Sequence, residues 1–197
     1  LPGPSGFRLG VAQGNIPQME KWDQEFQESI WNRYEELTAK IRLGEPDLII
    51  WPETAVPDYL PFPAVSERLK GIAAATQTAL LVGVPYEESP GSIFNSAALL
   101  DAEGRLLTRY DKIHLVPFGE YLPLEPVLGW LRQLVLMGSF THGERPVVFV
   151  PPSAPEDKFS VLICFEDLFP GLCRRFVQEG ARWFAVITND AWFHRSA

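Results

Sequence analysis

The chain has 197 residues, of which 46% are hydrophobic, so it is long and apolar enough to bury a substantial core. Its formal net charge of −8 and its pI near 4.9 exclude a nucleic acid as the expected partner, because binding a phosphate backbone requires a basic surface. No stretch reaches the roughly 18 consecutive apolar residues of a membrane-spanning helix.

The first part of the chain alternates between strand and helix patterns. Residues 7–16 read as a strand, and residues 23–43 carry apolar side chains at intervals of three and four, which predicts an amphipathic helix with Asp23 as its N-cap. Residues 47–53 are a short apolar run typical of a strand that is buried on both faces. A second helix is expected at 64–79 and a further strand at 79–86. This order favours a layered α/β domain.

The second part of the chain is richer in strand patterns. Two β-type runs within 93–112 flank residues 101–104, which is a hairpin signal. Further strands are expected at 145–150, 158–164 and 181–190, with a helix at 170–179, whereas the proline-rich stretches 57–63 and 151–155 read as loops.

Three of the predicted strands are followed by a side chain that could take part in covalent chemistry. These are Glu53, Lys112 and Cys164. In layered α/β sheets a site forms where strands end, so the three groups could meet there. A thiol is mostly protonated at neutral pH, and a carboxylate can take its proton as the thiol attacks a carbonyl. The ammonium and the backbone N–H of Phe165 would then stabilise the oxyanion.

Each of these residues also has a structural alternative. Taken alone, a cysteine on an apolar run is most often an inert core residue, and a lysine at a strand end most often lies on the surface. Glu53, after Trp-Pro, could be a helix-capping or solvated carboxylate. The spacing of Cys164 and Cys173 matches no common zinc pattern, and the three histidines are dispersed, so neither a metal nor another cofactor is predicted. A disulfide between the two cysteines remains possible, although it would remove Cys164 from any chemistry.

The sequence motifs around these residues favour the catalytic interpretation over the structural one. The segments "WPETAVP", "YDKIHLVPFGEYLP", "ICFED" and "TNDAWF", in this order, resemble the nitrilase (carbon-nitrogen hydrolase) superfamily, which implies an αββα sandwich. More narrowly, "GNIPQMEKWD", "HLVPFGEYLP" and "NDAWF" resemble the apolipoprotein N-acyltransferase family of the bacterial inner membrane. The similarity extends over about residues 7–193.

The resemblance implies a role for each residue that matches a family motif. It implies Glu53 as general base, Lys112 as the oxyanion-stabilising cation and Cys164 as the nucleophile that becomes a thioester. Glu120 and Glu166 match two supporting glutamates, which could instead only orient Lys112 or tie loops together.

Two tryptophans are candidates for substrate binding. Trp22 matches a tryptophan implicated in substrate engagement, although it could simply pack. Trp130 lies in residues 123–140, whose apolar face, if helical, fits either a core helix or an arm that covers an acyl chain at the membrane surface. The family more often has Tyr where this chain has Phe165.

The resemblance therefore implies one nitrilase-like catalytic domain over 1–197, facing the periplasm at the inner membrane. Both ends look cut, so closing strands of the sandwich and flanking transmembrane regions are expected outside the chain. The implied partners are a phospholipid acyl donor, a diacylglyceryl-modified apolipoprotein acceptor and the membrane surface. The alternatives are a soluble amidase or nitrilase-type hydrolase, which uses water as the acceptor, and an inactive lipid- or partner-binding module.

Overall fold

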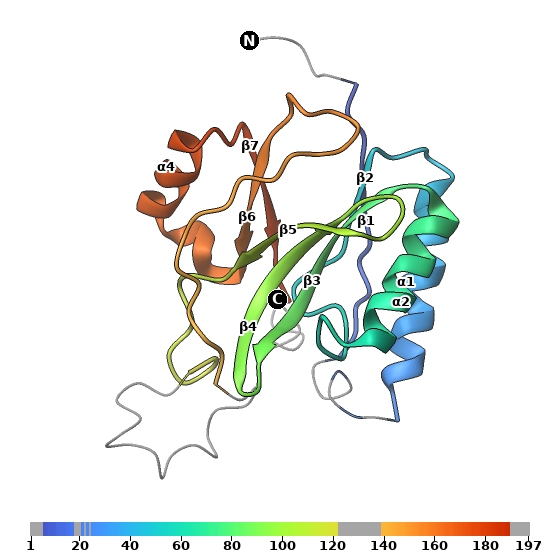
Figure 1. The fold of residues 1–197 in the computed structure, drawn as a ribbon, viewed down its shortest axis with the longest axis horizontal. Helices are drawn as coiled ribbons and strands as arrows, with labels where there is room; N and C mark the ends of the chain where they lie inside the picture. Colours follow the sequence, from blue (N-terminus) through green and yellow to red (C-terminus); the bar gives the residue numbers. More distant parts are fainter. Residues whose placement is uncertain (1–5, 18–20, 22, 24, 122–138, 190–197) are drawn as a thin grey trace, which may run out of the picture.

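The fold is a stack of four layers, seen edge-on in Figure 1. A computed structural model describes residues 6–17, 21, 23, 25–121 and 139–189. Helices α1 (Gln27–Arg42) and α2 (Pro63–Thr76) cover a five-stranded sheet, and a two-stranded sheet and helix α4 (Pro170–Gln178) lie on its other side. The strands are β1 (Leu9–Val11), β2 (Leu48–Ile50), β3 (Ala79–Ser89), β4 (Ser92–Leu100), β5 (Leu106–Asp111), β6 (Phe159–Ile163) and β7 (Trp183–Ile187).

The order of the larger sheet brings the ends of distant strands to one edge. Strands β1, β2 and β3 are parallel neighbours, whereas β4 runs antiparallel to both β3 and β5. Strand β5 therefore points in the same direction as β2, and the carboxyl ends of these two strands lie on the same side. Strand β4 begins on that side, so residues near its start reach the same edge.

The core follows from the two-residue period of the strands. In β3, Leu80 and Val82 face α1 and α2 and pack with Leu69, whereas Leu81 between them faces the smaller sheet and packs in the cluster that contains Val161. The larger sheet is thus buried on both faces, which explains why β2 and β3 read as continuous apolar runs.

Several elements differ from the sequence prediction, in their bounds or in whether they form. Helix α1 starts at Gln27 with Phe26 as its N-cap, because the Asp23 carboxylate accepts the N–H of Glu25 in a turn outside the helix. The first strand spans only Leu9–Val11. Residues 145–150 form no strand but a single bridge between Phe149 and Phe159, since the flanking prolines have no N–H to extend the pairing.

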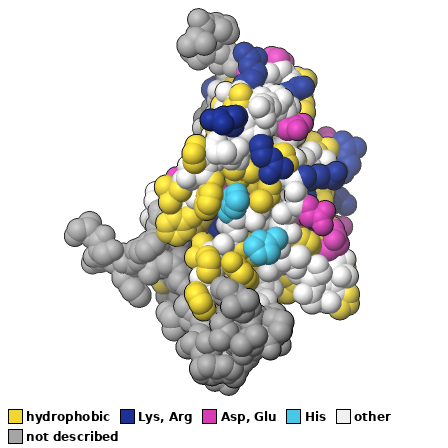
Figure 2. All heavy atoms as spheres, turned by 90° about the vertical axis from the view of Figure 1, so that its left-hand side faces the viewer, with side chains coloured by type: hydrophobic (Ala, Val, Ile, Leu, Met, Phe, Trp, Pro, Cys, Tyr) yellow, Lys and Arg dark blue, Asp and Glu magenta, His cyan; other side chains and the backbone are white. Residues whose placement is uncertain are grey.

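One face of the molecule gathers exposed hydrophobic side chains beside two histidines (Figure 2). His114 stacks on Phe169 with ring centroids 4.1 Å apart, and His142 meets Tyr121 edge-on. The exposed large apolar residues include Phe118, four residues after His114, and Phe165, Leu168 and Phe169, the last of which is the ring that stacks on His114. Within the described ranges, no helix has the length and apolar character needed to cross a bilayer.

Candidate active site

Glu53 is fixed at the sheet edge by a close approach of two backbones. The chain leaves β2 at Ile50 and passes over Gly83, where a Cβ atom would lie 2.1 Å from the carbonyl oxygen of Pro52. The N–H of Ala55 then donates to the carbonyl of Gly83 at 2.8 Å. Only a glycine in β3 leaves room for this path, which carries the Glu53 side chain into the interior, where it is 6% exposed.

Lys112 follows β5 directly and is held from both sides. Its N–H donates to the carbonyl of Asn95, and its own carbonyl accepts the N–H of Gly143. The side chain is 1% exposed, and its Nζ lies 2.9 Å from Glu120 Oε2 and 3.5 Å from Glu53 Oε1. The lysine therefore forms an ion pair with two carboxylates from separate segments of the chain.

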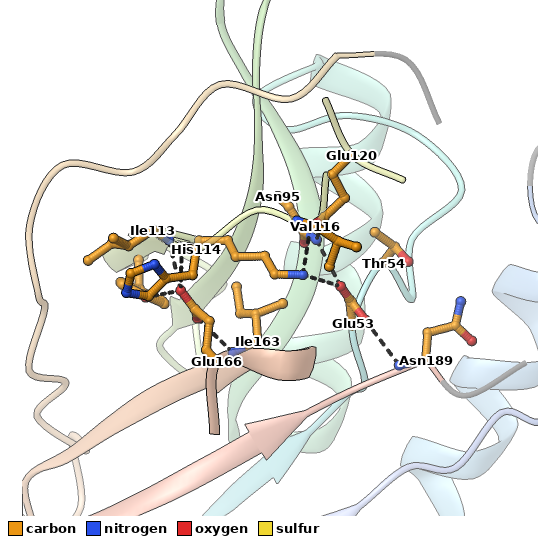
Figure 3. Close-up of polar contacts among 12 residues, drawn as sticks. Glu53, Thr54, Asn95, Ile113, His114, Val116, Glu120, Ile163, Glu166 and Asn189 are labelled. Atoms are coloured by element: carbon orange, nitrogen blue, oxygen red, sulfur yellow. Dashed lines mark hydrogen bonds and ion pairs between the residues drawn. The ribbon is translucent and has the colours of Figure 1, made fainter. Parts of the chain in front are cut away.

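Asn95 joins the same two carboxylates and was not predicted from the sequence. Its Nδ2 donates to Glu53 Oε1 at 2.8 Å and to Glu120 Oε1 at 2.7 Å (Figure 3). Ionised carboxylates only accept hydrogen bonds, so the NH₂ group must be the side of the amide that faces them. The available signal was a polar residue inside the apolar run "SIFNSAALL".

Backbone groups complete the coordination of these carboxylates. The N–H of Val116 donates to Glu120 Oε2, and the N–H of Asn189, after β7, donates to Glu53 Oε2 (Figure 3). The N–H of Phe140 donates to the carbonyl of Glu120 at 2.8 Å. The glutamates are thus held in fixed orientations from four parts of the fold.

Burial and charge set the protonation of this cluster. Burial raises the pKa of Glu53, while Lys112 and the hydrogen bond from Asn95 oppose that rise. Burial would lower the pKa of Lys112, but the carboxylates of Glu53 and Glu120 outweigh it and raise the pKa. Lys112 therefore stays charged, and Glu53 can hold a proton more readily than an exposed glutamate.

Cys164 lies at the end of β6 in a conformation that is rare for its type. Its φ is 55°, in the left-handed region, and it opens a 3₁₀-helix over Cys164–Leu168. Burial, followed by the charge of Glu53, raises the pKa of the Cys164 thiol, opposed by Lys112 and by hydrogen bonds from Thr188 and the Phe165 N–H. The group is thus a thiol at neutral pH, and it needs a base in order to attack a carbonyl.

Glu166 ties the cysteine turn to the segment after Lys112. Its Oε1 accepts the hydroxyl of Tyr110 and the N–H groups of Ile113 and His114, at 2.8, 2.8 and 3.1 Å. Its Oε2 accepts the N–H of Ile163 at 2.9 Å (Figure 3). This carboxylate has no contact with Lys112 Nζ among the described hydrogen bonds, so its place in the site is that of a clamp between two loops.

The structure therefore brings together most of the residues expected from the sequence. Glu53, Lys112 and Glu120 are in direct contact, and the first two act electrostatically on Cys164. The Phe165 side chain is exposed. Trp22 and Trp130, with most of residues 123–140, lie outside the described residues. Cys164 and Cys173 are both free thiols, and Cys173 lies within α4.

Glu53 and Lys112 lie at the edge of the larger sheet of this four-layered fold, and Cys164 follows β6 of the smaller sheet. Residues 8–197 match the carbon-nitrogen hydrolase family model, and the chain belongs to the carbon-nitrogen hydrolase family. It is similar to the apolipoprotein N-acyltransferase of Geobacter metallireducens, with 41% identity over 99% of this chain and 38% of the relative. It is also similar to that of Methylococcus capsulatus, with 37% identity over 98% of this chain and 38% of the relative.

Solved structures agree with the fold. An amidase from Nesterenkonia sp. superposes with a TM-score of 0.69 at 23% identity, covering 92% of this chain and 64% of the amidase. A mutant of the Nesterenkonia AN1 amidase, from the nitrilase superfamily, gives a TM-score of 0.70 at 24% identity, covering 94% of this chain and 66% of the amidase. The predicted nitrilase-like α/β fold is confirmed. The chain spans little more than a third of the length of the two curated relatives named above.

Proposed function

We propose that the chain is the catalytic part of an apolipoprotein N-acyltransferase, in which Cys164 is the nucleophile, Glu53 the general base and Lys112 the oxyanion-stabilising cation. The observation that carries the proposal is the similarity to enzymes of that name along nearly the whole chain. The buried cluster beside Cys164 supports it, because that cluster supplies each group that a thioester mechanism needs.

In the first half-reaction the Cys164 sulfur attacks the ester carbonyl of a phospholipid. The thiol proton passes to Glu53, a C–S bond forms, and the oxyanion is stabilised by Lys112 and the N–H of Phe165. The C–O ester bond then breaks, and Glu53 returns the proton to the departing lysophospholipid oxygen. The acyl chain is now a thioester on Cys164.

In the second half-reaction the α-amine of a diacylglyceryl-cysteine on an apolipoprotein attacks the thioester. A C–N bond forms and the C–S bond breaks, and Glu53 takes a proton from the amine and passes it to the departing sulfur, which restores the Cys164 thiol. Both substrates are membrane lipids, so the proposed location is the bacterial inner membrane with the domain facing the periplasm. Trp22 and Trp130 remain predictions as substrate contacts.

The apolar surface next to the nucleophile suits this substrate class. Phe165 and Phe169 are exposed, and Leu168 between them is 67% exposed. Large apolar side chains grouped on a surface favour an apolar ligand or a membrane. The fold itself also suits an amidase, which would use the same residues with water as the acceptor. The nature of the adduct and of the acceptor distinguishes the two.

Intact-mass spectrometry tests the proposal. The full natural chain that carries these residues is incubated with phosphatidylethanolamine in detergent micelles, beside Cys164→Ala and the matched control Cys173→Ala. We expect a mass gain of one acyl chain, removed by hydroxylamine, in the natural protein and in the Cys173→Ala variant, and none in Cys164→Ala. A folded natural protein without an adduct, or an adduct that survives Cys164→Ala, would contradict the proposal.

The pH dependence of acylation provides a second prediction. Glu53 must be ionised to take the thiol proton, and burial raises its pKa above the usual range of a glutamate. The initial rate of thioester formation should therefore fall as the pH drops through that raised pKa. Glu53→Gln should lower the rate by about 10²–10⁴-fold and remove this acid limb. A variant that keeps the natural pH profile would show that Glu53 is not the base.

A further inference from the structure

Lys21 is a buried cation that the proposed mechanism does not use. Its side chain is 3% exposed, and its Nζ donates to the Glu53 carbonyl at 3.2 Å and to Thr54 Oγ1 at 3.3 Å. A lysine is rarely buried unless it is paired. Lys21 is thus bound to the turn that carries the carboxylate of Glu53.

The net charge of the buried cluster around Glu53 gives a reason for the presence of Lys21. Glu53 and Glu120 contribute −2 and Lys112 contributes +1, which leaves a buried net charge of −1. A buried charge without a counter-charge is costly. Lys21 brings the sum to zero. Burial lowers the pKa of Lys21 to about 8, against the opposing effect of Glu53, so the ammonium is the main form at pH 7.

The turn held by Lys21 is strained. Thr54 has a φ of 44°, which places a β-branched residue in the left-handed region. Such a conformation is unfavourable for a β-branched residue and persists only where the surroundings hold it. The two hydrogen bonds from Lys21, to the residues on either side of the Glu53–Thr54 peptide bond, supply part of this hold.

We propose that Lys21 is a positioning residue for Glu53, whose ammonium holds the Glu53–Thr54 turn and favours the ionised form of the Glu53 carboxylate. The inference rests on the proposed function, in which Glu53 is the base. The negative charge of Glu53 acts to raise the pKa of Lys21. In turn, the positive charges of Lys112 and Lys21 act to lower the pKa of Glu53, and the negative charge of Glu120 acts to raise it. In the proposed function, the Cys164 thiol is the group whose proton Glu53 takes.

The test compares pH profiles of Lys21→Met with those of the natural protein and of Lys40→Met, a control on the exposed side of α1. Two rates are measured by intact mass: thioester formation with phosphatidylethanolamine, and alkylation of Cys164 by iodoacetamide. For Lys21→Met we expect the midpoint of the acid limb to move up by about one pH unit, with about tenfold slower reaction below it. Lys40→Met should match the natural protein.

Two further variants keep the charge and separate it from the hydrogen bonds. Lys21→Arg and Thr54→Val should retain the natural midpoint, and Thr54→Val should lower the rate at the plateau. A natural midpoint in folded Lys21→Met overturns the inference. If that variant does not fold, a shifted midpoint in Lys21→Arg or an unchanged plateau in Thr54→Val overturns it.

The alkylation readout separates this inference from the proposed function. If the natural protein forms no thioester from phospholipid, the acyltransferase proposal fails, but the alkylation profile still reports how Glu53 acts on Cys164. A midpoint shift in Lys21→Met then supports the inference, and an unshifted midpoint overturns it. If Glu53→Gln leaves the alkylation profile unchanged, the assigned base is wrong and the inference fails with it.

Discussion

Lys112→Met is expected to abolish detectable thioester formation on Cys164 and to lower the stability of the fold. The substitution keeps the volume of the side chain but leaves Glu53 and Glu120 buried without the cation between them. Removing one member of a buried ion pair typically costs about 3–5 kcal/mol. Loss of an oxyanion-stabilising group separately costs about 10²–10³-fold in rate.

Two measurements separate these effects. Urea denaturation gives the change in the free energy of unfolding, and intact mass gives acylation under conditions where the variant remains folded. Lys70→Met is the matched control, because Lys70 forms an exposed ion pair with Glu67. A folded Lys112→Met variant that acylates at the natural rate would remove Lys112 from the mechanism. An unchanged unfolding free energy would show that the two carboxylates are neutral in the folded protein.

Glu166→Gln is expected to destabilise the protein and to slow acylation, although glutamine has nearly the same shape. All four groups that the Glu166 carboxylate contacts are donors: one hydroxyl and three backbone N–H groups. An amide can accept on only one side, so its NH₂ group would face a donor, either at Ile163 or at the segment after Lys112. An unsatisfied buried donor costs about 1–3 kcal/mol, and the lost charge weakens the remaining bonds.

The neighbouring carboxylate provides the control. Asp167 is exposed, so Asp167→Asn removes the same charge one residue away without removing a buried acceptor. We expect Asp167→Asn to unfold at the natural urea concentration and Glu166→Gln at a lower one, with a slower gain of the acyl mass in the latter. Equal behaviour of the two variants would show that Glu166 does not clamp the cysteine turn.

The elements that could be predicted from the sequence are those whose own periodicity determines them. Helix α2, strand β3, the hairpin of β4 and β5, and strands β6 and β7 lie where the apolar patterns placed them. The prediction of a strand at 145–150 was wrong because pairing depends on a partner, and among the residues that the structure describes Phe149 pairs with Phe159 alone.

The residues of the candidate site likewise fall into those that a local sequence pattern reveals and those that only the folded structure reveals. Glu53, Lys112, Glu120 and Cys164 could be located because family motifs surround them. Asn95 could not, because it reaches Glu53 across 42 residues through the register of an antiparallel pair, which no local pattern encodes. Lys21 was missed for a different reason. A lysine in a polar segment is normally solvated, and only its contacts identify it as buried.

The hydrogen bond from Phe140 to the carbonyl of Glu120 has a consequence for how such proteins can diversify. It holds the two ends of the intervening stretch together beside Lys112. Closing a longer loop costs little, about 0.6 kcal/mol for each doubling of its length. Insertions, deletions and changes of composition between these two residues can therefore accumulate while the reactive groups stay in register.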